Sequence, residues 1–281
     1  MRKLISALVC VALLTSCFGA ALAEETDVAW TYAVTLSGLN DEYQILVNKD
    51  HPLEDPNFAP DDLELVTAQN TDIVTGENTN GGLALASSTS IQLSTRVVNA
   101  LFSMFTAAKQ QGYDLYLRAG WRSEADQQKR YDRKTDGENT DAPGTNDYQT
   151  GYACSVVNYD FRGRTPTAEQ FLATVEGQWI VENCARFGFV IRFPEGKEDI
   201  TGHSYEPWHL RYVGIEAAKY MTSNNLTLEE FDAEKTAAFE EFAARGGDVE
   251  EARAAAILPD GPVQIKTAGP DGDWEIILFH D

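Results

Sequence analysis

The sequence predicts an α+β fold in which a small, mainly antiparallel sheet is flanked by helices. Three observations lead to this prediction. Helical and strand-like segments mix without a regular βαβ alternation, the strand-like segments are short, and an apolar content of 43% is ample for a buried core. The 281 residues suit one domain of moderate size followed by a C-terminal extension.

Two helices are clearly indicated in the first half of the chain. Apolar residues recur at spacings of three and four after Ser94 and Thr95, either of which can cap a helix that ends at Gly112. Ser123 can cap a second helix over residues 124–131.

Other segments supply the strands and the later helices. We expect a helix at 179–187 and strands at 113–119, 151–157, 188–193 and 205–212. Thr227 and Glu230 form a capping box, and helical segments run on to about residue 255. The stretch 24–45 is strand-like, and the tail 259–281 predicts turns with one or two strands.

The N-terminus predicts a secretory leader. Met1, Arg2 and Lys3 form a basic head, an uncharged run follows, and Ala21-Leu22-Ala23 precedes two glutamates. The apolar run is short for a transmembrane span. We expect a signal peptide at 1–23 and an extracytoplasmic protein, secreted or associated with the cell envelope.

A lipoprotein is the alternative. Leu14-Thr15-Ser16-Cys17 resembles a bacterial lipobox, which would make Cys17 the lipid-anchored N-terminus. Either leader places the protein outside the cytoplasm.

The charge limits the partners. The chain carries a net charge of −22, which becomes −24 once the leader and its two cations are removed. Such a chain does not bind nucleic acid or an anionic membrane surface non-specifically. Cys154 and Cys184 remain after the leader, and they are either one disulfide or two buried thiols.

Glu206-Pro207-Trp208-His209 is the sharpest local motif. A glutamate three residues before a histidine can act as a general base beside a metal ligand, because it can take a proton from a metal-bound water. On its own this spacing recurs by chance, so the surrounding sequence decides its meaning.

That surrounding sequence resembles the VanY-type D-alanyl-D-alanine carboxypeptidases, which are zinc peptidases that trim peptidoglycan stem peptides. The resemblance covers roughly residues 43 to 230. It rests on five stretches in the same order: Leu46–Leu53, Gly120–Ser123 with Gln127, Pro143–Gly144 with Gln149–Gly151, Trp179–Gly202, and Tyr205–Gly214. It implies a single D,D-peptidase-like domain at 24–230 and an extension of helix and strand at 231–281.

The zinc motif is where this sequence departs from the family. The family pattern is Ser-x-His-Gln-Thr-Gly-x-Ala-x-Asp, and its His and Asp are two of three protein ligands. Here Tyr148 stands at the His position and Ser155 at the Asp position, so only His209 remains. A catalytic zinc normally has three protein ligands and a water. We therefore expect zinc in the family but none in this protein.

Neighbouring residues do not replace the lost ligands in this interpretation. If the chain is extended here, alternation directs Asp147 and Cys154 away from the site, whereas His203 could reach inward. The resemblance implies that Glu206 is the base and that Arg122 pairs with carboxylate or oxyanion charge.

The remaining candidate residues are those expected to contact substrate. With Arg122 they are Ser123, Gln127 and Trp208, although Ser123 also suits a helix cap and Trp208 also suits the core. Two hypotheses follow. The protein is a carboxypeptidase with impaired catalysis, or a metal-free pseudoenzyme that binds cell-wall or other short peptides.

Overall fold

The computed structural model describes residues 43–67, 85–86, 90–134, 140–244, 263–268 and 273–278. Residues 41–233 belong to one compact unit. The leader, nearly all of the strand-like stretch at 24–45 and the predicted helical segment beyond residue 244 lie outside the described residues.

The central sheet has four strands in the order β3-β4-β6-β5, and all three pairings are antiparallel. The strands are β3 (Tyr116–Ala119), β4 (Ala153–Val157), β5 (Phe189–Ile191) and β6 (His209–Tyr212). A separate antiparallel pair consists of β1 (Leu63–Thr67) and β2 (Ser90–Ser94). These sheets confirm the predicted α+β class.

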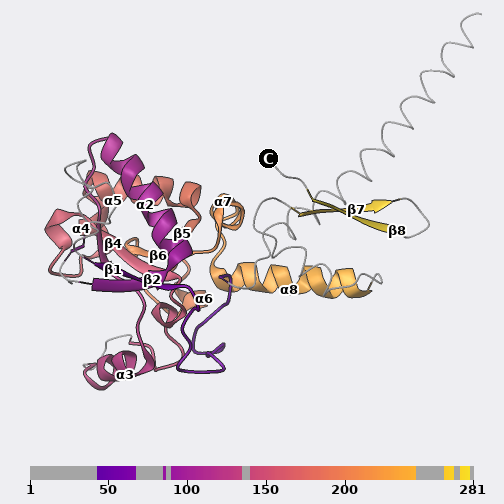
Figure 1. The fold of residues 1–281 in the computed structure, drawn as a ribbon, viewed down its shortest axis with the longest axis horizontal. Helices are drawn as coiled ribbons and strands as arrows, with labels where there is room; N and C mark the ends of the chain where they lie inside the picture. The colour runs from indigo at the N-terminus through magenta and orange to yellow at the C-terminus, as the bar shows by residue number, and fades with distance from the viewer. Residues whose placement is uncertain are drawn as a thin grey trace, which may run out of the picture. The chain divides into compact units, whose positions relative to one another are not determined.

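The helix α2 (Thr95–Gln110) supplies one apolar side of the core (Figure 1). It buries Val97, Leu101, Met104, Phe105 and Ala108, which share a core cluster with apolar residues of the central sheet. The residues that recur at the predicted spacing of three and four thus form the face of α2 that packs against the core. Ser94 is the residue before the helix, but its hydroxyl donates to Asp62 (2.7 Å) and makes no cap bond.

The other helical segments are short except for the last, which has 17 residues. They are α3 (Glu124–Asp132), η2 (Asp147–Thr150), η3 (Tyr159–Phe161), α4 (Ala168–Leu172), α5 (Val175–Asn183), η4 (Cys184–Phe187), α6 (Glu198–Thr201), α7 (Ile215–Ser223) and α8 (Leu228–Ala244). In Figure 1, α3 lies apart from α2 and α5, which share the other end of this unit.

Two predicted boundaries differ from the structure for local reasons. The helix expected at 179–187 begins at Val175, because Thr174 caps it by accepting from the Gly177 amide, and its last turn is the 3₁₀ segment η4. The strand expected from residue 205 begins only at His209. Pro207 has no amide hydrogen to donate to a neighbouring strand, and Pro207 and Trp208 form a turn before the strand.

The capping box at the start of α8 is present as predicted. The Thr227 amide donates to Glu230 Oε2 (2.8 Å), and the Glu230 amide donates to Thr227 Oγ1 (3.1 Å). The tail forms an antiparallel pair, β7 (Val263–Ala268) and β8 (Asp273–Leu278). Within the described residues, no helix has the length and apolarity needed to cross a bilayer.

Both cysteines of the main unit are free and buried. Cys154 and Cys184 belong to the same core cluster. Burial raises the pKa of Cys184 to about 12 and raises the pKa of Cys154 as well. The structure therefore has two buried thiols, the second of the two alternatives that the sequence allows.

Candidate functional site

The register of three strands places two key side chains, those of Ser155 and His209, next to each other. Ser155 on β4 is the cross-strand partner of His209 on β6, and on its other side it is paired with Ala119 of β3. Directly opposed residues on neighbouring strands project from the same face of a sheet. The register therefore brings the former Asp position beside the surviving histidine, as the aligned motifs predict.

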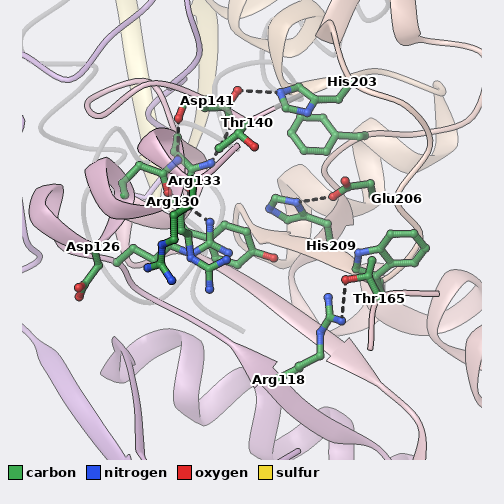
Figure 2. A pocket seen from close by; sticks show the side chains of 16 residues that line it. Arg118, Asp126, Arg130, Arg133, Thr140, Asp141, Thr165, His203, Glu206 and His209 are labelled. Carbon is green, nitrogen blue, oxygen red and sulfur yellow. Dashed lines mark hydrogen bonds and ion pairs between the residues drawn. The ribbon is translucent and has the colours of Figure 1, made fainter. Parts of the chain in front are cut away.

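This face opens into a cleft of about 680 Å³ (Figure 2). The residues that line it are Arg118, Arg122, Asp126, Gln127, Arg130, Arg133, Thr140, Asp141, Asn146, Tyr148, Thr165, Phe193, His203, Glu206, Trp208 and His209. Five of the predicted site residues therefore line one cleft with Tyr148, whereas Ser155 lies at 0% exposure beneath it.

Glu206 and His209 form a hydrogen-bonded pair at the cleft wall. Glu206 Oε2 lies 3.1 Å from His209 Nδ1, and the His209 amide donates to the Glu206 carbonyl (2.9 Å). Burial opposes the charged form of Glu206, but the bond from His209 and the charges of His209 and His203 hold its pKa below the usual value. Glu206 is therefore a carboxylate at neutral pH.

Tyr148 occupies the space between the positions of the family ligands. Its ring stacks on His209 with the ring centroids 4.5 Å apart, and its hydroxyl donates to Ser155 Oγ (3.2 Å). Burial raises the pKa of Tyr148 to about 12, so the phenol is neutral at physiological pH. The two replacement residues thus bind each other, and neither presents a charged oxygen.

Arg122 packs on the Tyr148 ring and is bonded to Gln127. The Arg122 guanidinium carbon is 4.0 Å from the Tyr148 ring centroid, and its Nη1 donates to Gln127 Oε1 (3.3 Å). Gln127 is fully buried and donates onward to the Asp141 carbonyl (2.7 Å). This chain fixes the guanidinium at the cleft.

Ser123 and Trp208 have packing or capping contacts of their own. Ser123 caps α3 by accepting from the Asp126 amide (3.2 Å), and it is not among the residues that line the cleft. Trp208 is buried against Phe171 with ring centroids 5.9 Å apart, while part of its side chain reaches the cleft.

The prediction that Asp147 points away from the site is wrong. The chain at this residue is not extended but begins η2, where the Asn146 side chain accepts from the Tyr148 amide. Asp147 Oδ2 consequently lies 3.8 Å from His209 Nε2 and 3.7 Å from Arg192 Nε, and Oδ1 accepts from Arg211. Asp147 is therefore part of a buried charge network beneath the site.

The structure places two other residues at the cleft, of which the sequence indicates only the first. His203, which the sequence suggests could reach inward, stacks on Phe193 (centroids 4.0 Å apart) and lies 3.1 Å from Asp141 Oδ1. Arg118 is the residue of β3 just before Ala119, which pairs with Ser155, and the sequence alone does not indicate its place at the cleft. Its signal is the register of β3 against β4, which becomes visible only in three dimensions.

The donor set does not fit a catalytic zinc. Such a zinc needs three protein ligands in tetrahedral geometry. At this site His209 Nδ1 is engaged by Glu206, and the Tyr148 and Ser155 hydroxyls are neutral and bonded to each other. Across the part of the chain that the structure describes, no group of three His, Cys, Asp or Glu side chains could hold a metal ion.

Comparison with known proteins agrees with the fold and the motifs. The family described as VanY, D-alanyl-D-alanine carboxypeptidase, matches residues 90–215. A putative carboxypeptidase, YodJ, of Bacillus subtilis (strain 168) is 41% identical over 140 residues, which are 47% of this chain and 50% of that protein. This chain thus spans only half of that relative's length.

Two solved structures are also similar. The LdcB LD-carboxypeptidase is 34% identical with a TM-score of 0.57, over 69% of this chain and 88% of that one. The D,D-dipeptidase VanXYg, solved with a D-Ala-D-Ala phosphinate analogue, is 29% identical with a TM-score of 0.52, over 69% of this chain and 74% of that one.

Proposed function

Because this chain belongs to the VanY-type D-alanyl-D-alanine carboxypeptidase family, we propose that its cleft binds a peptidoglycan stem peptide without zinc-dependent hydrolysis. The relatives support a peptidoglycan peptide as the ligand class, since one was solved with a D-Ala-D-Ala analogue. The protein acts outside the cytoplasm in this proposal, after loss of residues 1–23, and the binding domain is residues 24–230.

The observation that carries the proposal is the position of Tyr148. Its neutral phenol is stacked on His209 and bonded to Ser155, so a side chain takes the place where three ligands would meet around a metal. Without a metal, Glu206 has no activated water to deprotonate, and its bond to His209 becomes structural. Binding groups of the cleft, by contrast, are retained.

Arg122 is the binding group that supports a peptide ligand most directly. Its planar guanidinium can bind a carboxylate through two parallel hydrogen bonds. It lies at the cleft beside Tyr148, and Gln127 holds it there. Family membership assigns the same residue to substrate charge, so the proposal keeps that role while removing the hydrolytic step.

The retained Glu206–His209 pair favours a second candidate, an active carboxypeptidase with an unusual metal site. That candidate requires Tyr148 to leave the site and two further ligands to arrive. Measurement of bound zinc in purified protein comprising residues 24–281 separates the two candidates.

The test combines metal content, peptide binding and peptide cleavage in one preparation. We expect no stoichiometric zinc after dialysis against zinc, and calorimetric binding of an N-acetylated peptide that ends in D-Ala-D-Ala. Mass spectrometry of the same mixture should recover the peptide intact. Replacing Arg122 with Gln should weaken binding, whereas Arg186→Gln, which removes an equal charge from an exposed residue outside the cleft, should not. One tightly held zinc per chain and chelator-sensitive release of D-Ala would overturn the proposal.

A further inference from the structure

Arg118 is the extra residue of a β-bulge at the cleft. β3 and β4 pair Leu117 with Val156 but Ala119 with Ser155, so the register shifts by one residue at Arg118. Bulges of this kind occur beside functional sites, where they re-aim a side chain. Figure 2 shows the Arg118 side chain rising from β3 with its guanidinium directed toward Thr165.

The Arg118 guanidinium reaches the position of the lost acidic ligand. Its Nη2 donates to Ser155 Oγ (3.5 Å) and its Nη1 to Thr165 Oγ1 (3.1 Å). Both acceptors are neutral hydroxyls. A guanidinium has five N–H donors, so most of its capacity for charge-assisted bonds is left for a ligand.

Arg122 is a second cation of the cleft whose side chain, within the described part of the chain, contacts only neutral groups. Its contacts are the amide oxygen of Gln127 and the Tyr148 ring. Among the residues described, neither Arg118 nor Arg122 has a carboxylate within the 4.0 Å ion-pair limit. Two partly buried guanidiniums thus lie near one phenol without a direct ion pair among the described residues.

The acidic residues of the cleft act on these two guanidiniums only at longer range, because each lies within 4.0 Å of another partner. The pairs are Asp126 with Lys129 (2.9 Å), Asp141 with His203 (3.1 Å) and Glu206 with His209 (3.1 Å). Among the described residues, neither guanidinium therefore has a direct ion-pair partner, although the chain's net charge is −22.

The pKa shifts agree with the burial of both guanidiniums. Burial lowers the pKa of Arg122 to about 10, although Tyr148, Asp141 and Glu206 act in the opposite direction. Burial is also the main cause of the lowered pKa of Arg118. A bound anion would relieve both effects, since it favours the charged form of each guanidinium.

We propose that Arg118 and Arg122 together form an oxyanion-binding site, in which Arg118, beside the Ser155 position of the lost acidic ligand, joins Arg122 in binding the ligand's terminal carboxylate. The identity of the ligand as a peptide rests on the function proposed above. The oxyanion chemistry rests only on the two guanidiniums and their surroundings.

The test uses two probes on the protein of residues 24–281. Inorganic phosphate reports the oxyanion site by itself. An N-acetylated peptide ending in D-Ala-D-Ala, compared with the same peptide as its C-terminal amide, reports the carboxylate within the proposed ligand. Binding of each probe is measured by calorimetry for wild type, Arg118→Gln, Arg118→Lys and Arg130→Gln. Arg130 lines the same cleft but is exposed, so its replacement controls for a change of cleft charge alone.

We expect Arg118→Gln to weaken phosphate and the carboxylate peptide by about tenfold or more, as the loss of a charge-assisted pair predicts. Arg118→Lys should recover only part of this loss, because an ammonium lacks the planar fork. Arg130→Gln should have a smaller effect than Arg118→Gln. Thermal unfolding of each variant checks that it is folded, and the partly exposed position of Arg118 makes its replacement compatible with the core.

The outcomes separate the two proposals. Phosphate binding that depends on Arg118, with no peptide binding, would support the oxyanion site and overturn the peptide-binding function. Equal affinity for the carboxylate and amide peptides, unchanged by Arg118→Gln, would overturn the oxyanion site and leave peptide binding in place. Equal losses in Arg118→Gln and Arg130→Gln would also overturn it, because net charge would then explain the effect.

Discussion

Restoring the family's zinc ligands should require a third substitution at Arg118. The double variant Tyr148→His and Ser155→Asp recreates a His, Asp, His set beside Glu206. However, Ser155 Oγ already lies 3.5 Å from Arg118 Nη2, so a carboxylate introduced there would form an ion pair with Arg118. That pair competes with zinc for the new ligand. We therefore expect the double variant to bind zinc weakly and the triple variant with Arg118→Leu to bind it more tightly.

The distance gives the size of the difference. Two unit charges about 4 Å apart interact by about 4 kcal/mol at an effective dielectric constant of about 20. Because Arg118 is partly exposed, we discount this by about half for solvent screening, to about 2 kcal/mol. Since each 1.36 kcal/mol is a factor of ten, the double variant should bind zinc roughly thirtyfold more weakly than the triple variant.

The assay is a zinc titration against a chromogenic chelator, followed by release of D-Ala from a peptide ending in D-Ala-D-Ala. A matched control adds Arg130→Leu to the double variant, because Arg130 lines the cleft but makes no recorded contact with Ser155. This control should gain less affinity than Arg118→Leu gives. Equal zinc affinity in the double and triple variants would refute the competition argument. If neither the double nor the triple variant binds zinc, features of the cleft other than the two replaced ligands must prevent metal binding.

Three further outcomes follow from the buried groups. Burial opposes the charge on Asp147, but Arg211 and other neighbours hold its pKa below the usual value, so its stabilisation is present above about pH 4 and lost as the pH falls through the lowered pKa. Asp147→Asn should lower the unfolding free energy by about 3 kcal/mol at pH 7 and by progressively less as the pH falls below about 4. Urea titrations at neutral and at acidic pH measure this difference. An equal loss at neutral and acidic pH would contradict the charge argument. Tyr148→Phe removes one buried hydroxyl bond and should cost about 1 kcal/mol in the same assay. Thiol titration of unreduced residues 24–281 should find Cys154 and Cys184 unreactive in the native protein and two reactive thiols after unfolding, whereas none after unfolding would mean a disulfide.

Local chemistry made the fold and part of the site predictable. The Ser123 cap and the Thr227–Glu230 capping box depend on residues a few positions apart, and both are present. The cleft residues Glu206 and His209 follow from a motif of four residues together with the ordered family motifs around it. Such features need no knowledge of how distant segments meet.

Other features could not be predicted because they depend on backbone geometry. The direction of Asp147 depends on η2, a 3₁₀ turn that Asn146 caps and that ends at Gly151 with φ 75°, rather than on extended alternation. The role of Arg118 depends on a one-residue shift between β3 and β4. In a regular strand, the alternation of side chains would place Arg118 on the opposite face of the sheet from Ala119.

The first turn of α8 has a consequence for how the protein can be shortened. Glu229 binds both Nη atoms of Arg192 (2.7 and 3.0 Å) and accepts from Asn48 Nδ2 (3.1 Å). Arg192 in turn lies beside Asp147, under the floor of the cleft. A truncated protein that ends before Leu228 would leave the buried Arg192 guanidinium without its bidentate partner. The smallest protein that keeps the shape of the cleft must therefore retain the first turn of α8, and at the C-terminal end only the sequence after that turn can be removed.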